Sequence, residues 1–139
     1  MNPFDKIKEQ IDEDLHHKLP KKWKKIGNIL IADFSQINKN DLARISRIYA
    51  GILKVKTVLQ KNRISGELRK PERIEILFGK DTKTEITEYG LKYKMDLSKT
   101  MWSPGNTGWR AVLDGPDKVS SFYNFGSPKV IIDYFAGIG

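Results

Sequence analysis

The apolar runs of this chain are short, and their length limits what it can form. The longest uncharged apolar stretches, such as residues 26–32, fall far below the roughly 20 residues that a membrane-spanning helix needs. The opening residues, MNPFDKIKEQ, lack the apolar segment of a secretory signal. We therefore expect a cytoplasmic chain of short helices and strands with no membrane partner. Its 139 residues are enough for one ordinary domain or two small ones.

Several kinds of functional site are excluded by the composition. The chain has 0 Cys, which rules out disulfide scaffolds, thiol catalysis and zinc sites built on cysteine. Its 2 His are adjacent, His16 and His17, so we expect no metal site and assign this pair no function. Hydrophobic residues make up 39% and charged residues 30%, a balance that favours a folded protein over a disordered one.

Positive charge is concentrated in one part of the chain. The net charge is +8, but residues 18–63 carry 12 basic and only 2 acidic side chains. Residues 1–17 have a net charge of −3, and residues 64–139 a net charge of +1. Such a block is typical of a surface that meets phosphates, because neutralising a polyanion releases its counterions. A lysine-rich solvated surface is the alternative.

Hydrophobic periodicity predicts a small α+β domain. Asn2 followed by Pro3 indicates a helix start, and residues 3–17 then carry apolar side chains at helical spacing. Asn40 or Asp41 is expected to cap a second helix, whose buried face is Leu42, Ile45, Tyr49 and Ile52. Strands are predicted at residues 26–32, 55–60, 74–78, 84–87 and 91–97, separated by turn signals. We expect these strands to form a small, largely antiparallel sheet.

The character of the sequence changes after Leu97. We expect residues 1–97 to form the basic α+β domain and residues 98–128, which are rich in Gly and Pro, to be an interdomain segment. Residues 129–139 then open a fully apolar strand, which is typical of a parallel sheet buried on both faces. We expect this to be the first strand of a second, incomplete α/β domain.

That strand ends in a glycine-rich turn with the sequence D-Y-F-A-G-I-G, residues 133–139. Glycines at such a turn let the backbone approach a ligand beyond the strand's carboxyl end. An apolar strand running into D-x-F-A-G-x-G resembles the first motif of class I S-adenosylmethionine enzymes, which have a Rossmann-like fold. A glycine-rich strand end without a ligand is the alternative.

Basic residues with interleaved aromatics are candidates for nucleic-acid contact. Trp23 lies inside a lysine run, where it either stacks on an RNA base or anchors the core. Residues 61–71 place four cations around a glycine, so this loop either contacts phosphates or is tied by Glu67 into an ion pair with Arg63 or Arg69. Trp102 and Trp109 flank a turn that is either pinned by aromatics or closes over a cofactor. The RNA-binding candidates are Lys21, Lys22, Lys24, Lys25, Lys61, Arg63, Arg69 and Lys70.

Taken together, several segments resemble one family, in its order along the chain. They are L-P-K-K-W (19–23) with I-G-N-I-L (26–30), V-K-T-V-L (55–59), G-E-L-R-K-P (66–71), Y-G-L-K-Y-K-M-D (89–96), S-P-G-N (103–106) and residues 133–139. The family is that of the archaeal tRNA wyosine-pathway enzymes, which act on the purine at tRNA position 37. One activity is guanine N1-methylation, and the other transfers the 3-amino-3-carboxypropyl group of S-adenosylmethionine to a wyosine precursor. The L-P-K-x-W and R-K-P segments look closer to the second.

This resemblance implies a division of labour along the chain. The N-terminal part would hold tRNA, and a class I domain beginning at Val130 would hold S-adenosylmethionine. The residues that match the family's cofactor contacts are Ser103, Arg110, Asp133, Phe135, Ala136, Gly137 and Gly139. The sequence departs from the family where Trp109 replaces an acid and Val112 replaces an arginine.

Catalytic residues are not identified by this resemblance. The family's remaining cofactor and substrate motifs belong after Gly139, so we expect the 139-residue chain to be inactive by itself. We also expect it to be monomeric. A non-catalytic RNA-binding module is the alternative from another functional class.

Overall fold

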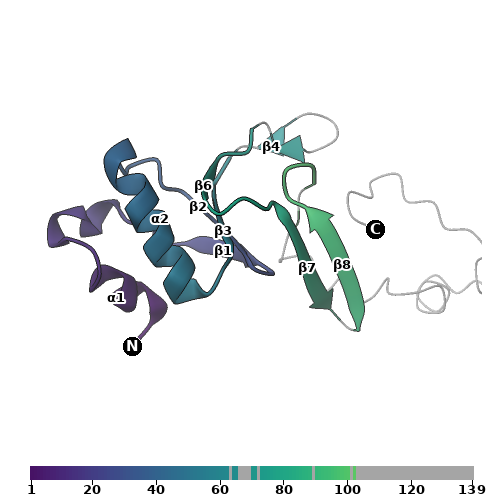
Figure 1. The fold of residues 1–139 in the computed structure, drawn as a ribbon, viewed down its shortest axis with the longest axis horizontal. Helices are drawn as coiled ribbons and strands as arrows, with labels where there is room; N and C mark the ends of the chain where they lie inside the picture. The colour runs from purple at the N-terminus through teal and green to yellow at the C-terminus, as the bar shows by residue number, and fades with distance from the viewer. Residues whose placement is uncertain (63, 66–69, 72, 89, 101, 103–139) are drawn as a thin grey trace, which may run out of the picture.

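A computed structural model describes residues 1–62, 64–65, 70–71, 73–88, 90–100 and 102. Its centre is a four-stranded sheet in the order β1-β2-β3-β6. The elements in chain order are α1 (Pro3–Lys8), the 3-10 helix η1 (Glu13–Lys18), β1 (Trp23–Ile26), β2 (Ile29–Ala32), α2 (Lys39–Leu53), β3 (Thr57–Gln60), β4 (Ile64–Ser65), β5 (Lys70–Pro71), β6 (Ile76–Phe78), β7 (Lys83–Glu88) and β8 (Leu91–Asp96). Helices α1 and α2 lie on one side of the sheet, and the β7–β8 hairpin lies on the other (Figure 1).

The sheet is mixed: most of its pairings are antiparallel, as the sequence predicts, but one is parallel. Strands β2 and β3 are parallel, whereas β1 pairs with β2 and β3 pairs with β6 in antiparallel fashion. Parallel neighbours need a long crossover, and α2 supplies it between β2 and β3. The predicted α+β class is correct for the described residues. The apolar strand expected in residues 129–139 lies outside them.

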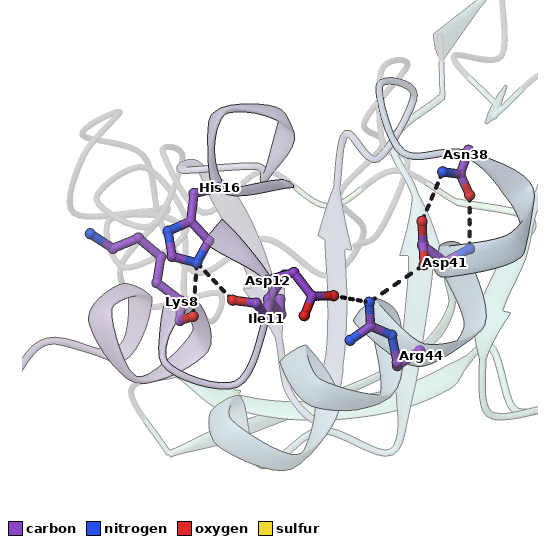
Figure 2. Close-up of polar contacts among 7 residues, drawn as sticks. All are labelled: Lys8, Ile11, Asp12, His16, Asn38, Asp41 and Arg44. Atoms are coloured by element: carbon purple, nitrogen blue, oxygen red, sulfur yellow. Dashed lines mark hydrogen bonds and ion pairs between the residues drawn. The ribbon is translucent and has the colours of Figure 1, made fainter. Parts of the chain in front are cut away.

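The single helix predicted over residues 3–17 is wrong, because the chain breaks after Lys8 and continues into the 3-10 helix η1. The His16 side chain occupies the break. Its Nε2 lies 2.9 Å from the Lys8 carbonyl oxygen and 2.8 Å from that of Ile11, as Figure 2 shows. Carbonyl oxygens only accept, so this nitrogen donates to both. The Lys8 carbonyl also accepts from the Ile11 amide at 3.1 Å, so His16 adds a second donor there and ties η1 to the end of α1.

The sequence predicts Asn40 or Asp41 as the N-cap of α2, but the helix begins earlier, at Lys39. Its N-cap is Asn38, whose Oδ1 accepts from the Asp41 amide at 3.0 Å while its Nδ2 donates to the Asp41 carboxylate at 2.8 Å. This reciprocal pairing satisfies an amide that the first turn would otherwise leave open. Arg44 then bridges Asp41 and Asp12, which joins α2 to the segment that follows α1 (Figure 2). The predicted apolar face of α2 is confirmed, with Ile45 and Tyr49 fully buried.

Residues 26–32 form the end of one strand, a turn and a second strand, where the sequence predicts a single strand. The turn is Gly27-Asn28, between β1 and β2. Gly27 has φ +57°, a conformation that side chains other than glycine adopt at a cost. A Cβ atom at this position would also meet the Thr84 hydroxyl and come within 2.7 Å of the Glu85 carbonyl oxygen on β7. The turn therefore requires glycine for two independent reasons.

The sheet is covered on both faces, with a separate hydrophobic core on each. The first core packs α1, η1 and α2 on the sheet and includes Ile7, Leu30, Tyr49 and Val58. The second core packs the β8 end of the hairpin against the opposite face. Its buried members are Ile26, Ile29, Leu59, Met95, Leu97 and Trp102. Alternate residues of β2 and β3 thus face different cores, and both strands are apolar throughout their centres.

A carboxylate holds the open end of the β7–β8 hairpin. Asp96 Oδ1 accepts from the Ser98 hydroxyl at 2.6 Å, the Thr82 hydroxyl at 2.6 Å and the Ser98 amide at 3.0 Å. The hydroxyls of Ser98 and Thr82 lower the pKa of Asp96 from 3.8 to about 2, because they stabilise the charged form.

We predict that Gly27→Ala lowers the free energy of unfolding by about 2–4 kcal/mol, from a disfavoured backbone conformation and the contact with β7. Gly51→Ala is the matched control, since Gly51 is exposed in α2 with no atom within 4 Å of an added Cβ. That substitution should stabilise the protein by about 0.5–1 kcal/mol. Urea denaturation measures both, and equal effects would contradict the structure.

The Asp96 network predicts acid sensitivity. A carboxyl with a lowered pKa stabilises the fold above its unfolded pKa, and this contribution disappears as the pH falls from about 4 to about 2. At neutral pH, Asp96→Asn should lower the free energy of unfolding by about 2 kcal/mol. The gap between the two proteins should narrow as the pH falls through that window. A gap that stays constant from neutral pH to pH 2 would show that the charge of Asp96 contributes nothing.

Candidate nucleic-acid interface

A groove of about 870 Å³ opens on the face of the sheet that carries the second core, at the end where β2 and β3 finish. Its volume falls in the range typical of ligand sites, about 300–1,000 Å³. Three backbone segments border it: residues 17–22 before β1, the residues after β2, and the residues after β3. Its apolar lining includes Ile26, Ile31, Leu59, Ile74, Leu97 and Trp102.

The strand register explains why these segments meet. Trp23, at the start of β1, pairs with Ala32, at the end of β2, which in turn pairs with Gln60, at the end of β3. The residues that precede β1 and those that follow β2 and β3 therefore lie at one end of the sheet. The Lys61 amide donates to the Ala32 carbonyl at 2.8 Å and continues this alignment beyond β3.

The floor of the groove is a row of side chains across three strands. Lys24 on β1 pairs with Ile31 on β2, and Ile31 pairs with Leu59 on β3. Paired residues project from the same face of a sheet, and neighbouring strands lie about 4.8 Å apart. Ile31 is therefore a half-buried apolar surface between a lysine at the sheet edge and the buried Leu59.

The charged lining is strongly positive. Lys18, Lys21, Lys22, Lys24 and Lys61 border the groove, and the acidic side chain among the described lining residues is Asp33. Within the described part of the chain, none of these five lysines makes an ion pair, whereas Lys8, Arg44, Lys56 and Lys94 do. The charge of Lys61 contributes to the lowered pKa of Asp33, and the other four lysines have no acidic partner among the described residues, so this surface suits an anion.

A hydrogen-bonded network fixes the far end of the groove. Gln60 donates from Nε2 to the Asp33 carboxylate at 3.0 Å and accepts from the Phe34 amide at 3.0 Å. Hydrogen bonds from Ser35 and from Gln60 hold the pKa of Asp33 below its ordinary value. Asp33 is therefore ionised at neutral pH and holds the loop after β2 beside Lys61.

The lysine segment at the other end is anchored to the core. The Tyr49 hydroxyl, buried on α2, donates to the Pro20 carbonyl at 2.9 Å, immediately before Lys21. Burial raises the pKa of Tyr49. The Trp23 ring packs edge-on against Tyr49, with ring centroids 6.0 Å apart, and also contacts Phe4. Core packing, one of the two interpretations of Trp23, is thus correct, and Trp23 is also among the residues that line the groove.

Four of the eight predicted RNA-binding residues converge on this groove: Lys21, Lys22, Lys24 and Lys61. Lys25 lies elsewhere, because its Nζ donates to the Leu53 carbonyl at the end of α2, at 2.9 Å. The backbone of Lys70 belongs to β5, paired with β4, while Arg63 and Arg69 lie outside the described residues.

The predicted cofactor contacts also lie outside the described residues: Ser103, Arg110, Asp133, Phe135, Ala136, Gly137 and Gly139. Trp102 is described, and it is buried in the second core with its ring centroid 5.0 Å from that of Tyr93. In the part of the chain that the structure covers, no three acidic or histidine side chains gather as metal ligands. No helix of that part is long and apolar enough to cross a membrane.

Sequence reasoning missed Lys18 and the apolar floor. Lys18 belongs to the same basic block, so its charge was a visible signal. Ile31 and Leu59 carry no local signal, because their alignment with Lys24 depends on pairings between distant segments.

Comparison with known proteins places this arrangement in a family. Residues 4–82 match the family model described as the TYW2 N-terminal domain. The chain is 39% identical over 136 residues to tRNA(Phe) (4-demethylwyosine(37)-C(7)) aminocarboxypropyltransferase of Pyrococcus horikoshii, covering 96% of this chain and 45% of that protein. It is 30% identical over 131 residues to tRNA (guanine(37)-N(1))-methyltransferase Trm5b of Pyrococcus abyssi, covering 93% of this chain and 37% of that protein.

A solved structure agrees with these sequence relationships. The crystal structure of P. horikoshii TYW2 in complex with MeSAdo superposes with a TM-score of 0.58 at 35% identity, covering 77% of this chain and 38% of that one. The chain spans less than half the length of the relatives it matches. The family model nevertheless covers more than half of this chain, and the chain therefore belongs to the TYW2 N-terminal domain family.

Proposed function

We propose that this chain is the tRNA-holding part of an S-adenosylmethionine-dependent transferase that adds a 3-amino-3-carboxypropyl group to a wyosine precursor at tRNA position 37. The observation that carries the RNA-holding role is the convergence of Lys21, Lys22, Lys24 and Lys61 on one groove. The reaction is proposed from the P. horikoshii relative, which is named for it.

The electrostatics of the groove support an RNA partner. Five lysines that make no ion pair within the described part of the chain line the groove with the Asp33 carboxylate, which Gln60 and Ser35 already hydrogen-bond. Phosphate contacts of this kind position a nucleic acid without reading its sequence. Their strength falls steeply with salt, because each contact releases a counterion.

S-adenosylmethionine, when bound, would supply an activated carbon for the transfer. The residues proposed to hold it, such as Ser103, Arg110 and Asp133, lie outside the described part of the chain. The described residues therefore contribute binding and orientation of the RNA, and no step of the chemistry is assigned to them. Orientation alone contributes to such a transfer, because it converts a bimolecular encounter into an intramolecular one.

Guanine-37 N1-methylation is the second candidate, favoured by the similarity to the P. abyssi methyltransferase. The two reactions differ in the group added and in the tRNA accepted. Mass analysis of the position-37 nucleoside distinguishes them, using unmodified and precursor-bearing tRNA with a protein that contains this chain and the cofactor motif. A non-catalytic RNA-binding module would bind tRNA and transfer neither group.

We predict that the chain binds tRNA and that Lys21→Glu combined with Lys24→Glu weakens the affinity about tenfold or more at about 0.15 M ionic strength. Each lost phosphate contact should also make the logarithmic salt dependence shallower by about 0.7–0.9. Fluorescence anisotropy of labelled tRNA across a salt series measures both quantities.

The matched control is Lys80→Glu combined with Lys92→Glu. Both of these lysines are exposed and outside the lining of the groove, and their replacement changes the net charge equally. This control should retain most of the affinity. Equal losses in the two double variants would show that only net charge matters, and the groove would not be the RNA site.

A further inference from the structure

We infer that the groove holds an unpaired RNA nucleotide, with its base on the Ile31 side chain and its flanking phosphates on lysines at the two ends of the groove. This inference rests on the proposed RNA-holding role and specifies the form of RNA that the site takes.

The floor of the groove is the first argument. A surface that served only as a phosphate clamp would need no apolar centre, yet Ile31 lies half-buried between Lys24 and Leu59 in one cross-strand row. Ile74 and Trp102 extend this apolar lining. A nucleobase presents a flat face that gains free energy when it leaves water for such a surface.

The placement of charge is the second argument. Lys21, Lys22 and Lys24 lie on the β1 side of the floor, whereas Lys61 follows β3 on the other side. One nucleotide within a strand has a phosphate on each side of its base. The arrangement of cation, apolar floor and cation therefore matches the order of phosphate, base and phosphate.

The polar end of the groove is the third argument. Asn62 borders the groove, and its Nδ2 is buried without a hydrogen-bond partner among the residues that the structure describes. Buried donors are normally paired, and leaving one without an acceptor destabilises the protein. Base-edge carbonyls, ring nitrogens and phosphate oxygens all accept hydrogen bonds, so a nucleotide at this end could supply the missing partner.

A double helix fits this site poorly. Paired bases are stacked on each other and covered by the two backbones, so a duplex presents phosphates but no base face to Ile31. Single-stranded loops and ends present unstacked bases, and proteins bind them by combining a cationic groove with a stacking surface. The apolar floor is what distinguishes the two forms of RNA.

The test compares four probes that separate charge from base contact, all bound to the full 139-residue chain. They are a labelled single-stranded RNA of about eight nucleotides, the same RNA annealed to its complement, an abasic oligonucleotide with the same number of phosphates, and polyglutamate. We expect the single strand to bind about fivefold or more tightly than each of the others at matched ionic strength.

The variants then assign this preference to the floor. Ile31→Ala should remove most of the preference for bases while leaving abasic binding unchanged. Ile31→Leu keeps the apolar volume and should retain the preference. Ile76→Ala is the matched control, because Ile76 is a 41% exposed isoleucine on β6 of the same sheet and does not line the groove. Thermal unfolding of each variant verifies that the fold persists.

Several outcomes would overturn the inference. Equal binding of the abasic and base-bearing strands would remove the base contact, and equal binding of polyglutamate would reduce the groove to a general anion surface. An Ile31→Ala protein that behaves like Ile76→Ala would exclude the floor. In each case, loss of tRNA binding in the Lys21 and Lys24 double variant would still support the proposed function, so the two failures are distinguishable.

Discussion

The parallel pairing of β2 with β3 is the constraint on which the rest of the structure depends. A parallel neighbour cannot be reached by a tight turn, so the chain must cross over one face of the sheet, and α2 does this with its apolar stripe. The pairing also brings the carboxyl ends of both strands to the same end of the sheet. Because β1 is antiparallel to β2, the lysine segment before β1 arrives there as well.

The groove is a consequence of unequal coverage of the two faces. On one face, α1, η1 and α2 bury the sheet, and the Trp23, Tyr49 and Phe34 rings pack among them. On the other face, the β7–β8 hairpin contributes Met95 and Leu97 to the second core. The hairpin meets the sheet close to the Gly27 turn, where the Thr84 hydroxyl contacts the Ile26 carbonyl and the Asn28 side chain. The opposite end of that face is where Ile31 remains half-buried and the lysines gather.

Local sequence patterns predicted the elements whose causes are local. The spacing of Ile45 and Tyr49 indicated the buried face of α2, and the lysine run indicated a basic surface, which the structure places along the groove. The break after α1 could not be predicted, because it depends on the His16 side chain folding back onto the Lys8 and Ile11 carbonyls. The turn at Gly27 was overlooked because its flanking residues are apolar, and the β7 strand that requires glycine there lies more than fifty residues away.

For the candidate site, the cations were predictable and the floor was not. The charge of the lysines is visible in the sequence. Ile31 belongs to the floor of the groove only because β1 and β3 pair with β2 on either side of it.

A hydrogen bond from the Tyr49 hydroxyl to the Pro20 carbonyl joins the first core to the lysine segment before β1. Lys21 and Lys22 make no ion pair within the described part of the chain. Contacts between their backbone segment and the core therefore position them. The Leu19 and Pro20 side of that segment is buried, while Lys21 and Lys22 are exposed. At the other end, Gln60 holds the loop after β2 in the same manner. The Tyr49 hydroxyl thus fixes one end of the groove, and the Gln60–Asp33 pair fixes the other, so none of the five lysines that line it is needed as an ion-pair partner within the described part of the chain.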